Sequence, residues 1–163
     1  MRLAVYAGAF DPITNGHLDV LERAAGMFDR VVMGVAEDAN KKMLFSVEER
    51  VSLIREVVSH LPNVSVEPFG GLLVDFCRRR HAQAVIRGLR AVSDFDLELQ
   101  MALMNRQMSG GVDTVFFMAS APYLFTSSSL IKNIAGLGGE IGSFVHPKVA
   151  EALERKYAAQ KKA

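Results

Sequence analysis

The chain has 163 residues, half of them hydrophobic, with 19 basic and 18 acidic side chains and a formal net charge of +1. This composition predicts one globular domain over residues 1–163 and excludes a disordered or fibrous protein, and the balanced charge does not support general binding to nucleic acid or to a membrane. The single cysteine, Cys77, excludes an internal disulfide. With no recognisable signal peptide or membrane-spanning run, we expect a cytoplasmic protein.

The first element is a predicted strand over Leu3–Ala7 that runs into Gly8, a turn and a helix opening at Thr14-x-Gly16-His17. The N–H groups of such a turn and helix start attract anions, which places His17 beside a candidate phosphate site. Gly8 and Gly16 would let the backbone turn tightly and approach a phosphate without a Cβ in the way. An ordinary strand-to-helix turn uses glycine equally well, but the polar opening around His17 favours a functional histidine.

The rest of the chain alternates between short apolar runs and amphipathic segments. Strands are predicted at Val31–Ala36, Val64–Phe69, Ala84–Ile86 and Thr114–Met118, and their nearly continuous apolar character favours a covered parallel sheet. Helices are predicted over 18–28, after the Ser46–Glu49 capping box, and over 72–81, 94–108, 126–135 (capped by Gly136) and 147–158, with 158–163 as a frayed tail. This alternation indicates an α/β fold with a doubly wound, mainly five-stranded parallel sheet and a site beyond the strands' carboxyl ends.

Three segments resemble known signatures. Gly8-x-Phe10-Asp11-Pro12-x-Thr14-x-Gly16-His17 resembles the first signature of the nucleotidylyltransferase superfamily, which has a Rossmann-like fold. Ser127-Ser128-Ser129-Leu130-Ile131-Lys132 resembles the second, where serine hydroxyls and free N–H groups would grip the outer phosphates of a nucleotide. A helix N-cap with extra serines is the plain alternative. Arg87-Gly88-Leu89-Arg90, followed by Asp94 and Glu98, is similar to the bacterial phosphopantetheine adenylyltransferases, and the similarity covers Tyr6 to about Lys132.

The resemblance implies transfer of AMP from ATP to 4′-phosphopantetheine, which yields dephospho-coenzyme A and pyrophosphate by direct displacement. It further implies Mg²⁺ that arrives with ATP, feedback inhibition by coenzyme A, and a homohexamer built as a dimer of trimers. The residues agree with this chemistry, because a phosphate acceptor needs no general base and the chain offers donors but no convincing nucleophile–base pair. The dispersed histidines and lone Cys77 suggest no protein metal site.

Roles follow from the same resemblance. His17, Lys41 and Arg90 would be catalytic, with His17 bonding the α-phosphate and Lys41 contacting the acceptor phosphate. The acceptor would be bound by Ala9, Lys41, Leu73 and Arg87. ATP would be bound by Ala9, Phe10, His17, Gly88, Leu89, Arg90, Glu98, Tyr123, Leu124, Phe125, Thr126, Ser127, Ser128 and Ser129.

Two positions depart from the family pattern. Ala9 stands where the family usually carries Thr or Ser, which removes a side-chain donor, and Leu97 replaces a common aromatic residue. Two alternatives therefore stay open: a sister transferase that uses another acceptor such as nicotinamide mononucleotide, and an ATP-binding sensor that has lost catalysis. Met101, Met104 and Met108 are predicted to lie in the core or at a subunit interface.

Overall fold

The structure is a computed structural model that describes residues 1–37 and 42–162. Strands and helices alternate along it, as the sequence predicts. The elements are β1 (Leu3–Gly8), α1 (Asn15–Ala25), β2 (Arg30–Ala36), α2 (Val47–Val57), β3 (Val64–Phe69), α3 (Leu73–Arg80), β4 (Ala84–Leu89), α4 (Val92–Ser109), β5 (Asp113–Met118), a short 3-10 turn (Ala121–Tyr123), α5 (Ser128–Gly136) and α6 (Pro147–Lys162).

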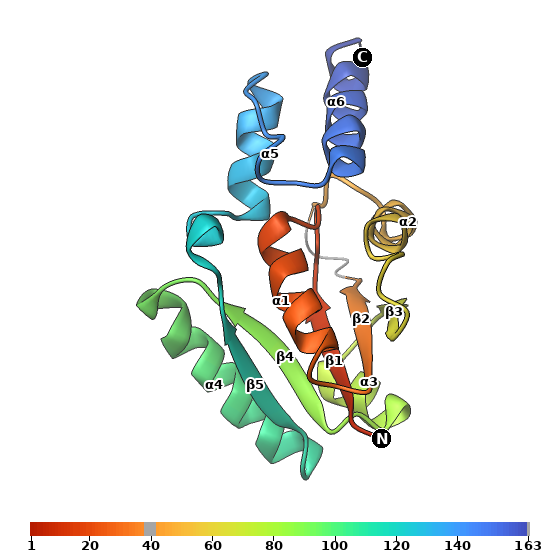
Figure 1. Ribbon diagram of the computed structural model, residues 1–163, viewed down its shortest axis with the longest axis vertical. Coiled ribbons are helices and arrows are strands. Elements are labelled where there is room, and N and C mark those ends of the chain that lie inside the picture. The colour runs from red at the N-terminus through yellow and green to blue at the C-terminus, as the bar shows by residue number, and fades with distance from the viewer. Residues whose placement is uncertain (38–41, 163) are drawn as a thin grey trace.

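The five strands form one parallel sheet in the order β3-β2-β1-β4-β5. The chain therefore winds outward from β1 in one direction through β2 and β3, and then in the other direction through β4 and β5. Between β1 and β4 the winding changes direction, and in such sheets ligands bind at this point beyond the carboxyl ends of the strands. The predicted doubly wound α/β fold is confirmed (Figure 1).

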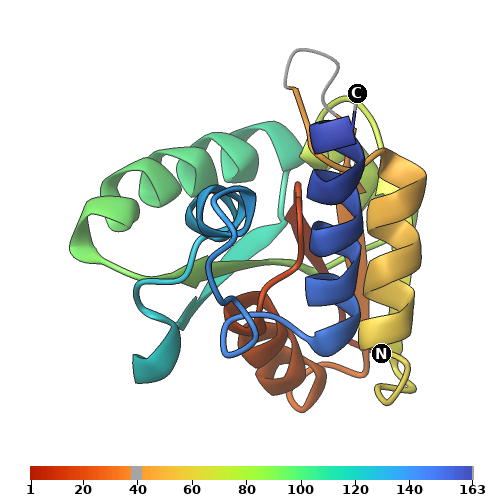
Figure 2. The ribbon, with the colours of Figure 1, turned by 90° about the horizontal axis from the view of Figure 1, so that it is seen from above.

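Alternate residues of β1 point to opposite faces of the sheet and enter two separate cores. Ala4 and Tyr6 belong to the larger core, which includes buried side chains of α1, α2, α5 and α6. Val5 belongs to the smaller core, with Phe76 and the fully buried Cys77 of α3. Seen from above, the sheet lies between α1 and α2 on one side and α3 and α4 on the other (Figure 2).

Several boundaries differ from the sequence expectations. Strand β4 continues to Leu89, so Arg87–Leu89 lie within the sheet rather than in a following loop. Helix α5 begins at Ser128 and includes Gly136, so the predicted glycine cap is wrong; Leu137 is the C-cap. Helix α6 continues to Lys162, so the predicted helix end near 158 is too early, and fraying of residues 158–163 stays a prediction.

Helix α4 is the least buried of the helices that cover the sheet. Met101, Met104 and Met108 are largely exposed, so the core half of their prediction is wrong for this chain, and a subunit interface stays a prediction. The helix has apolar residues on several sides rather than in one stripe, which is unusual for a helix on the surface of a single chain. Within residues 1–37 and 42–162, no helix has the length and apolar character needed to span a bilayer.

Candidate active site

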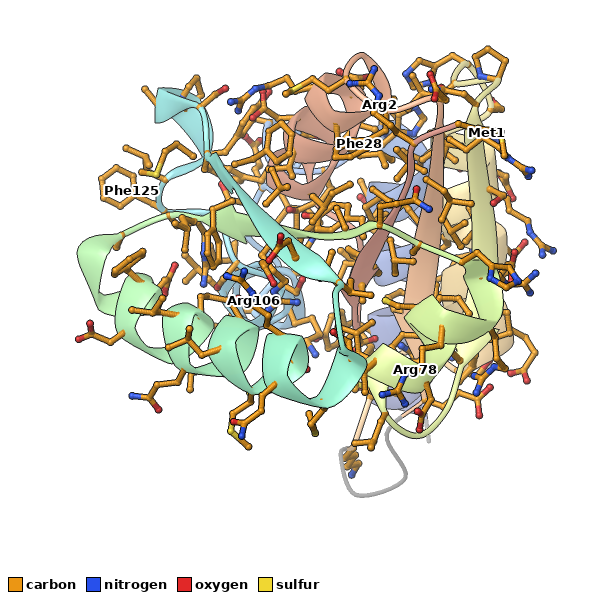
Figure 3. All side chains as sticks on the ribbon, turned by 90° about the horizontal axis from the view of Figure 1, so that it is seen from below. Met1, Arg2, Phe28, Arg78, Arg106 and Phe125 are labelled. Carbon is orange, nitrogen blue, oxygen red and sulfur yellow. The ribbon has the colours of Figure 1, made fainter. Side chains whose placement is uncertain are left out.

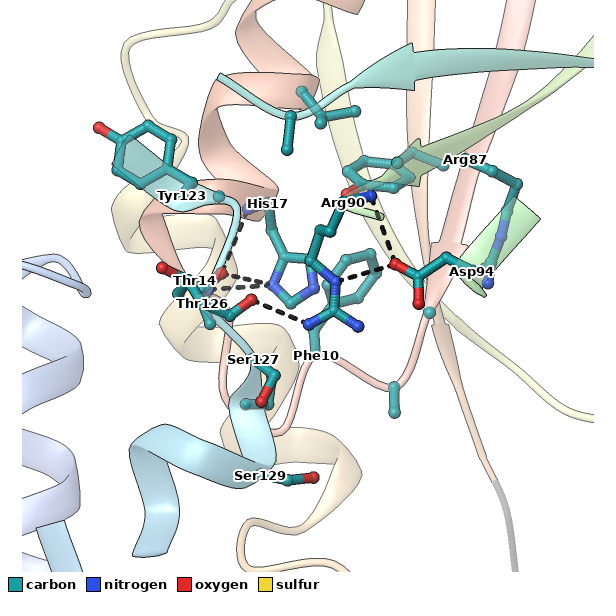
Figure 4. Close-up of a pocket in the computed structure, with 18 of the residues that line it drawn as sticks. Phe10, Thr14, His17, Arg87, Arg90, Asp94, Tyr123, Thr126, Ser127 and Ser129 are labelled. Carbon is teal, nitrogen blue, oxygen red and sulfur yellow. Dashed lines mark hydrogen bonds and ion pairs between the residues drawn. The ribbon is translucent and has the colours of Figure 1, made fainter. Parts of the chain in front are cut away.

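A pocket of about 630 Å³ opens at the carboxyl ends of β1 and β4. Its walls come from the turn after β1, the first turn of α1, the end of β4, the start of α4 and the segment that leads into α5 (Figure 4). Two helix N-termini, those of α1 and α5, therefore meet at one cavity. Because the free N–H groups of a helix start carry positive partial charge, this arrangement favours a polyanionic ligand.

The turn after β1 has an unusual backbone at Phe10. Its φ is +48°, a left-handed conformation that a bulky residue rarely adopts. The Phe10 ring is buried and packs edge-on against Tyr6 and His17, with ring centroids 5.3 and 5.1 Å away. A Cβ on Gly8 would meet this ring at 3.1 Å. Gly8 is therefore needed to make room for Phe10, and the left-handed residue of the turn is not a glycine.

His17 is held in one tautomer by the start of α1. The N–H of Thr14 donates to His17 Nδ1 (3.1 Å), and the N–H of His17 donates to Thr14 Oγ1 (3.2 Å), which together form a capping box. A backbone N–H can only donate, so Nδ1 must be unprotonated and Nε2 carries the proton of the neutral ring. Burial, together with the charges of Arg90 and Arg87, lowers the pKa of His17 to about 4. At neutral pH the ring is a neutral Nε2–H donor.

Arg90 ties the end of β4 to the segment before α5. Its Nη1 donates to the carbonyl of Thr126 at 3.0 Å, and its Nε lies 3.4 Å from a carboxylate oxygen of Asp94 (Figure 4). The Thr126 hydroxyl is buried on the pocket wall and has no hydrogen-bond partner among the described residues. Arg90 and a hydroxyl without a partner among the described residues thus both line the cavity.

Arg87 and Glu98 form a two-pronged ion pair at the rim. The guanidinium donates to both carboxylate oxygens, at 2.6 and 2.7 Å, and also to the carbonyl of Ala7 at 2.8 Å. The Glu98 carboxylate raises the pKa of Arg87. Glu98 therefore holds Arg87 in place in this structure, a contact that the sequence did not predict.

The three serines at the start of α5 have different hydrogen-bond roles. Ser127 caps the helix by accepting from the N–H of Leu130 (3.1 Å), and the Ser128 hydroxyl donates to the carbonyl of Pro12 (2.8 Å). Ser129 lines the pocket without a hydrogen bond from its side chain to another described residue. The plain N-cap interpretation thus accounts for Ser127, while Ser128 joins α5 to the turn after β1.

Asp11 is a buried carboxylate within the turn after β1. It accepts from Lys132 Nζ (2.7 Å) and from the N–H groups of Leu44 and Phe45 (2.9 Å each). Burial acts to raise the pKa of Asp11, but these hydrogen bonds outweigh it and leave the pKa below its ordinary value. Asp11 therefore joins the turn, α5 and the segment before α2.

The structure brings most of the predicted site residues together. The pocket is lined by Ala9, Phe10, His17, Arg87, Gly88, Arg90, Glu98, Tyr123, Thr126, Ser127, Ser128 and Ser129. Leu73, Leu89, Leu124 and Phe125 do not line it. Leu89 is buried, Leu73 packs against the smaller core, and Phe125 projects away from the protein with 84% of its surface exposed (Figure 3). Lys41 lies outside the described residues.

Sequence reasoning assigned no site role to several of the side chains that shape the pocket. Asp11, Thr14 and Lys132 belong to the two nucleotidylyltransferase signatures, and Asp94 follows the Arg87–Arg90 segment, but the sequence alone predicts a site role for none of them. A buried carboxylate signals that a cation must pair with it, and the basic residue that follows the serines is the available clue in the sequence. Among the described residues, no group of three or more His, Cys, Asp or Glu is placed to hold a metal ion.

The chain is similar to named relatives over nearly its full length. The profile of the family described as cytidylyltransferase-like matches residues 5–134. A phosphopantetheine adenylyltransferase from Moorella thermoacetica is 55% identical over 157 residues, which cover 96% of this chain and 98% of the relative. One from Herminiimonas arsenicoxydans is 51% identical over 160 residues, which cover 98% of each chain.

Solved structures share the fold. The bifunctional NMN adenylyltransferase/ADP ribose pyrophosphatase of Francisella tularensis superposes with a TM-score of 0.72 at 17% identity, over 94% of this chain and 49% of that one. At that identity the likeness concerns the fold alone. The sequence relatives, at 51% and 55% identity, also identify the family. This chain belongs to the cytidylyltransferase-like family and, within it, to the phosphopantetheine adenylyltransferases.

Proposed function

We propose that this protein transfers AMP from ATP to 4′-phosphopantetheine and releases dephospho-coenzyme A and pyrophosphate. The observation that carries the proposal is the 55% identity to a phosphopantetheine adenylyltransferase over 96% of the chain. The pocket supports it, because two helix N-termini, His17, Arg87 and Arg90 surround one cavity of a size that suits a nucleotide and part of an acceptor.

The proposed reaction is a single in-line displacement. An oxygen of the acceptor phosphate forms a bond to the α-phosphorus of ATP as the bond to the bridging oxygen breaks, and pyrophosphate leaves with the bonding electron pair. Charge builds up on the non-bridging oxygens of the α-phosphate, where the Nε2–H of His17 would donate. The acceptor is already an anion, so neither a general base nor a covalent intermediate is needed.

The remaining site residues would bind and orient the substrates. Arg87, held by Glu98, would meet the acceptor phosphate, and Arg90 would meet the nucleotide. The unpaired hydroxyl of Thr126 and the free N–H groups at the start of α5 would receive polar atoms of ATP. Holding two anions in line within a partly enclosed pocket is itself a large part of the catalysis.

Mg²⁺, coenzyme A and self-association complete the proposal. Mg²⁺ is usually held by substrate phosphates with few protein ligands, and it would enter the pocket bound to ATP. It would neutralise charge on the leaving pyrophosphate. Coenzyme A, which contains the product, would compete for the same pocket. Assembly into a hexamer would bury the exposed apolar residues of α4.

The test follows pyrophosphate release by purified protein with ATP and Mg²⁺. Parallel reactions contain 4′-phosphopantetheine, nicotinamide mononucleotide or no acceptor. The matched variants are His17→Ala, which removes the proposed phosphate donor, and His60→Ala, which removes an exposed histidine paired with Glu22 on the surface.

Pyrophosphate release that requires 4′-phosphopantetheine, and that is lost in His17→Ala but kept in His60→Ala, would support the proposal. Release with nicotinamide mononucleotide instead would assign the other acceptor. ATP binding without release in any reaction would identify a sensor. Added coenzyme A should raise the KM for the acceptor, and light scattering should give the mass of the assembly.

A further inference from the structure

Arg50 is a buried cation that lies behind the pocket rather than in its wall. It stands in the first turns of α2, and only 2% of its surface is exposed. Its Nη1 donates to the carbonyl of Ala9 (2.6 Å) and to the carbonyl of Ala36 (3.0 Å), and its Nε donates to the carbonyl of Phe45 (3.3 Å). A single guanidinium therefore joins the turn after β1, the last residue of β2 and the segment that precedes α2.

Asp11 makes the complementary connection. It accepts from the N–H groups of Leu44 and Phe45, so the turn after β1 binds the segment before α2 through a carboxylate as well as through Arg50. Phe45 thus has its N–H bound by Asp11 and its carbonyl bound by Arg50. The position of the turn is fixed from two sides by charged groups that are themselves buried.

The bond to Ala9 also fixes the direction of one peptide group. The Ala9–Phe10 peptide is trans, because Asp11–Pro12 is the cis bond within the described residues. In a trans peptide the C=O and the N–H point in opposite directions. The Ala9 carbonyl points at Arg50, so the N–H of Phe10 points away from α2. No described residue accepts a hydrogen bond from this N–H.

The left-handed conformation of Phe10 is consistent with an imposed orientation. A bulky residue at φ +48° persists only where its surroundings hold it there, and such residues gather at ligand-binding sites. Arg50 holds the Ala9–Phe10 peptide before Phe10, and the residue after it, Asp11, is held by its hydrogen bond from the N–H of Leu44.

We propose that Arg50 is a positioning residue that turns the Phe10 N–H into the pocket as a donor to a phosphate of the nucleotide. This inference deepens the proposed function and rests on it for the identity of the ligand. The inference also explains why Ala9 matters. Because alanine has no hydroxyl, phosphate binding at this turn depends on the N–H of Phe10, and hence on Arg50. A lysine at position 50 keeps the charge but cannot span three carbonyls with one planar fork.

The test compares two substitutions in the same helix. Arg50→Lys disturbs the carbonyl contacts under the turn. Arg55→Lys is the matched control, because Arg55 donates to the carbonyl of Val66 in β3 (3.1 Å) and does not line the pocket. Three readouts are taken: the melting temperature, the Kd for ATP with Mg²⁺ by calorimetry, and kcat and KM for ATP.

For Arg50→Lys we expect the Kd and the KM for ATP to rise about 10- to 100-fold, the range for losing one hydrogen bond to a charged group. Arg55→Lys should change the Kd and the KM for ATP less than about 2-fold, even if its melting temperature falls as much as that of Arg50→Lys. A purely structural role would lower the active fraction, and so kcat, and leave KM unchanged. Unchanged ATP affinity in folded Arg50→Lys would overturn the proposal.

A second comparison isolates the peptide donor. Ala9→Thr is introduced into the wild type and into Arg50→Lys. If the threonine hydroxyl replaces a misdirected N–H, ATP affinity should improve by a larger factor in the Arg50→Lys background, whereas equal factors would refute the role of the Phe10 N–H. ATP binding is read without an acceptor. A wild type that binds ATP but releases no pyrophosphate would therefore contradict the proposed function alone. The role of Arg50 would still be decided by the ATP affinities of the variants.

Discussion

The neutral state of His17 gives the sharpest prediction about the site. With a pKa of about 4, the ring stays about nine-tenths neutral when the pH is lowered from 8 to 5, whereas a histidine with the ordinary pKa of 6.5 would be only about 3% neutral at pH 5. The proton of the neutral ring should reside on Nε2, because the N–H of Thr14 occupies Nδ1.

Long-range ¹H–¹⁵N NMR on protein with labelled histidine reports both properties at once. The chain has four histidines, and the signal that disappears in His17→Gln is that of His17. We expect an Nε2–H pattern that hardly changes between pH 8 and 5. Arg90→Gln should raise the pKa of His17 by removing a positive charge, though by less than the full shift, because burial is the larger cause. A midpoint near 6.5, or a proton on Nδ1, would refute the reasoning.

Three further outcomes are expected. Ala9→Thr should raise kcat/KM for ATP about tenfold or more, since one donor to a charged group contributes about 1.5–3 kcal/mol; steady-state pyrophosphate release measures it, and no gain would show that backbone donors suffice. Glu98→Gln should lower the free energy of unfolding by about 1–3 kcal/mol, because it breaks the two-pronged pair with Arg87; an unchanged urea midpoint would contradict the pair. The folded state holds the pKa of His17 below that of the unfolded chain, so its stabilisation is present above pH 6.5 and is lost as the pH falls toward 4. Between pH 7 and 4.5 the wild type should therefore lose roughly 2 kcal/mol more than His17→Gln in urea unfolding; equal losses would contradict the burial of a neutral ring.

The sequence predicted the sheet well because its signal is local. Runs such as Val31–Ala36 and Val64–Phe69 are nearly continuously apolar, and the strands lie where these runs lie. The capping box at Ser46 and Glu49 was also readable, since both of its hydrogen bonds connect residues three apart. The local pattern predicted the ends of elements less well. Strand β4 was predicted to end at Ile86, but it extends to Leu89 because Leu89 pairs with Met118 of β5.

The contacts that build the site were less predictable because they join distant segments. Nothing near Arg50 in the sequence shows that its side chain reaches the carbonyl of Ala9. The basic character of Lys132 indicates a cation at the start of α5 but does not identify Asp11, 121 residues earlier, as its partner. The turn after β1 differs from the prediction in one respect. The sequence predicts that glycine supplies the tight turn, but Phe10 adopts the left-handed conformation and Gly8 makes room for the Phe10 ring. The predicted role of Lys41 stays a prediction.

The central position of β1 has a consequence for how the protein is made. The Arg87 guanidinium reaches a carbonyl 80 residues earlier in the chain, and the Ser128 hydroxyl reaches one 116 residues earlier. The lining of the pocket extends to Lys132, so the pocket cannot form on a growing polypeptide until about four-fifths of the chain has been synthesised. Contacts over such separations form slowly. A ligand that binds only the finished pocket stabilises it by about 2.7 kcal/mol at a concentration of 100 Kd. A nucleotide that binds only this pocket would thus stabilise chains that extend at least to Lys132 and leave shorter ones without that contribution.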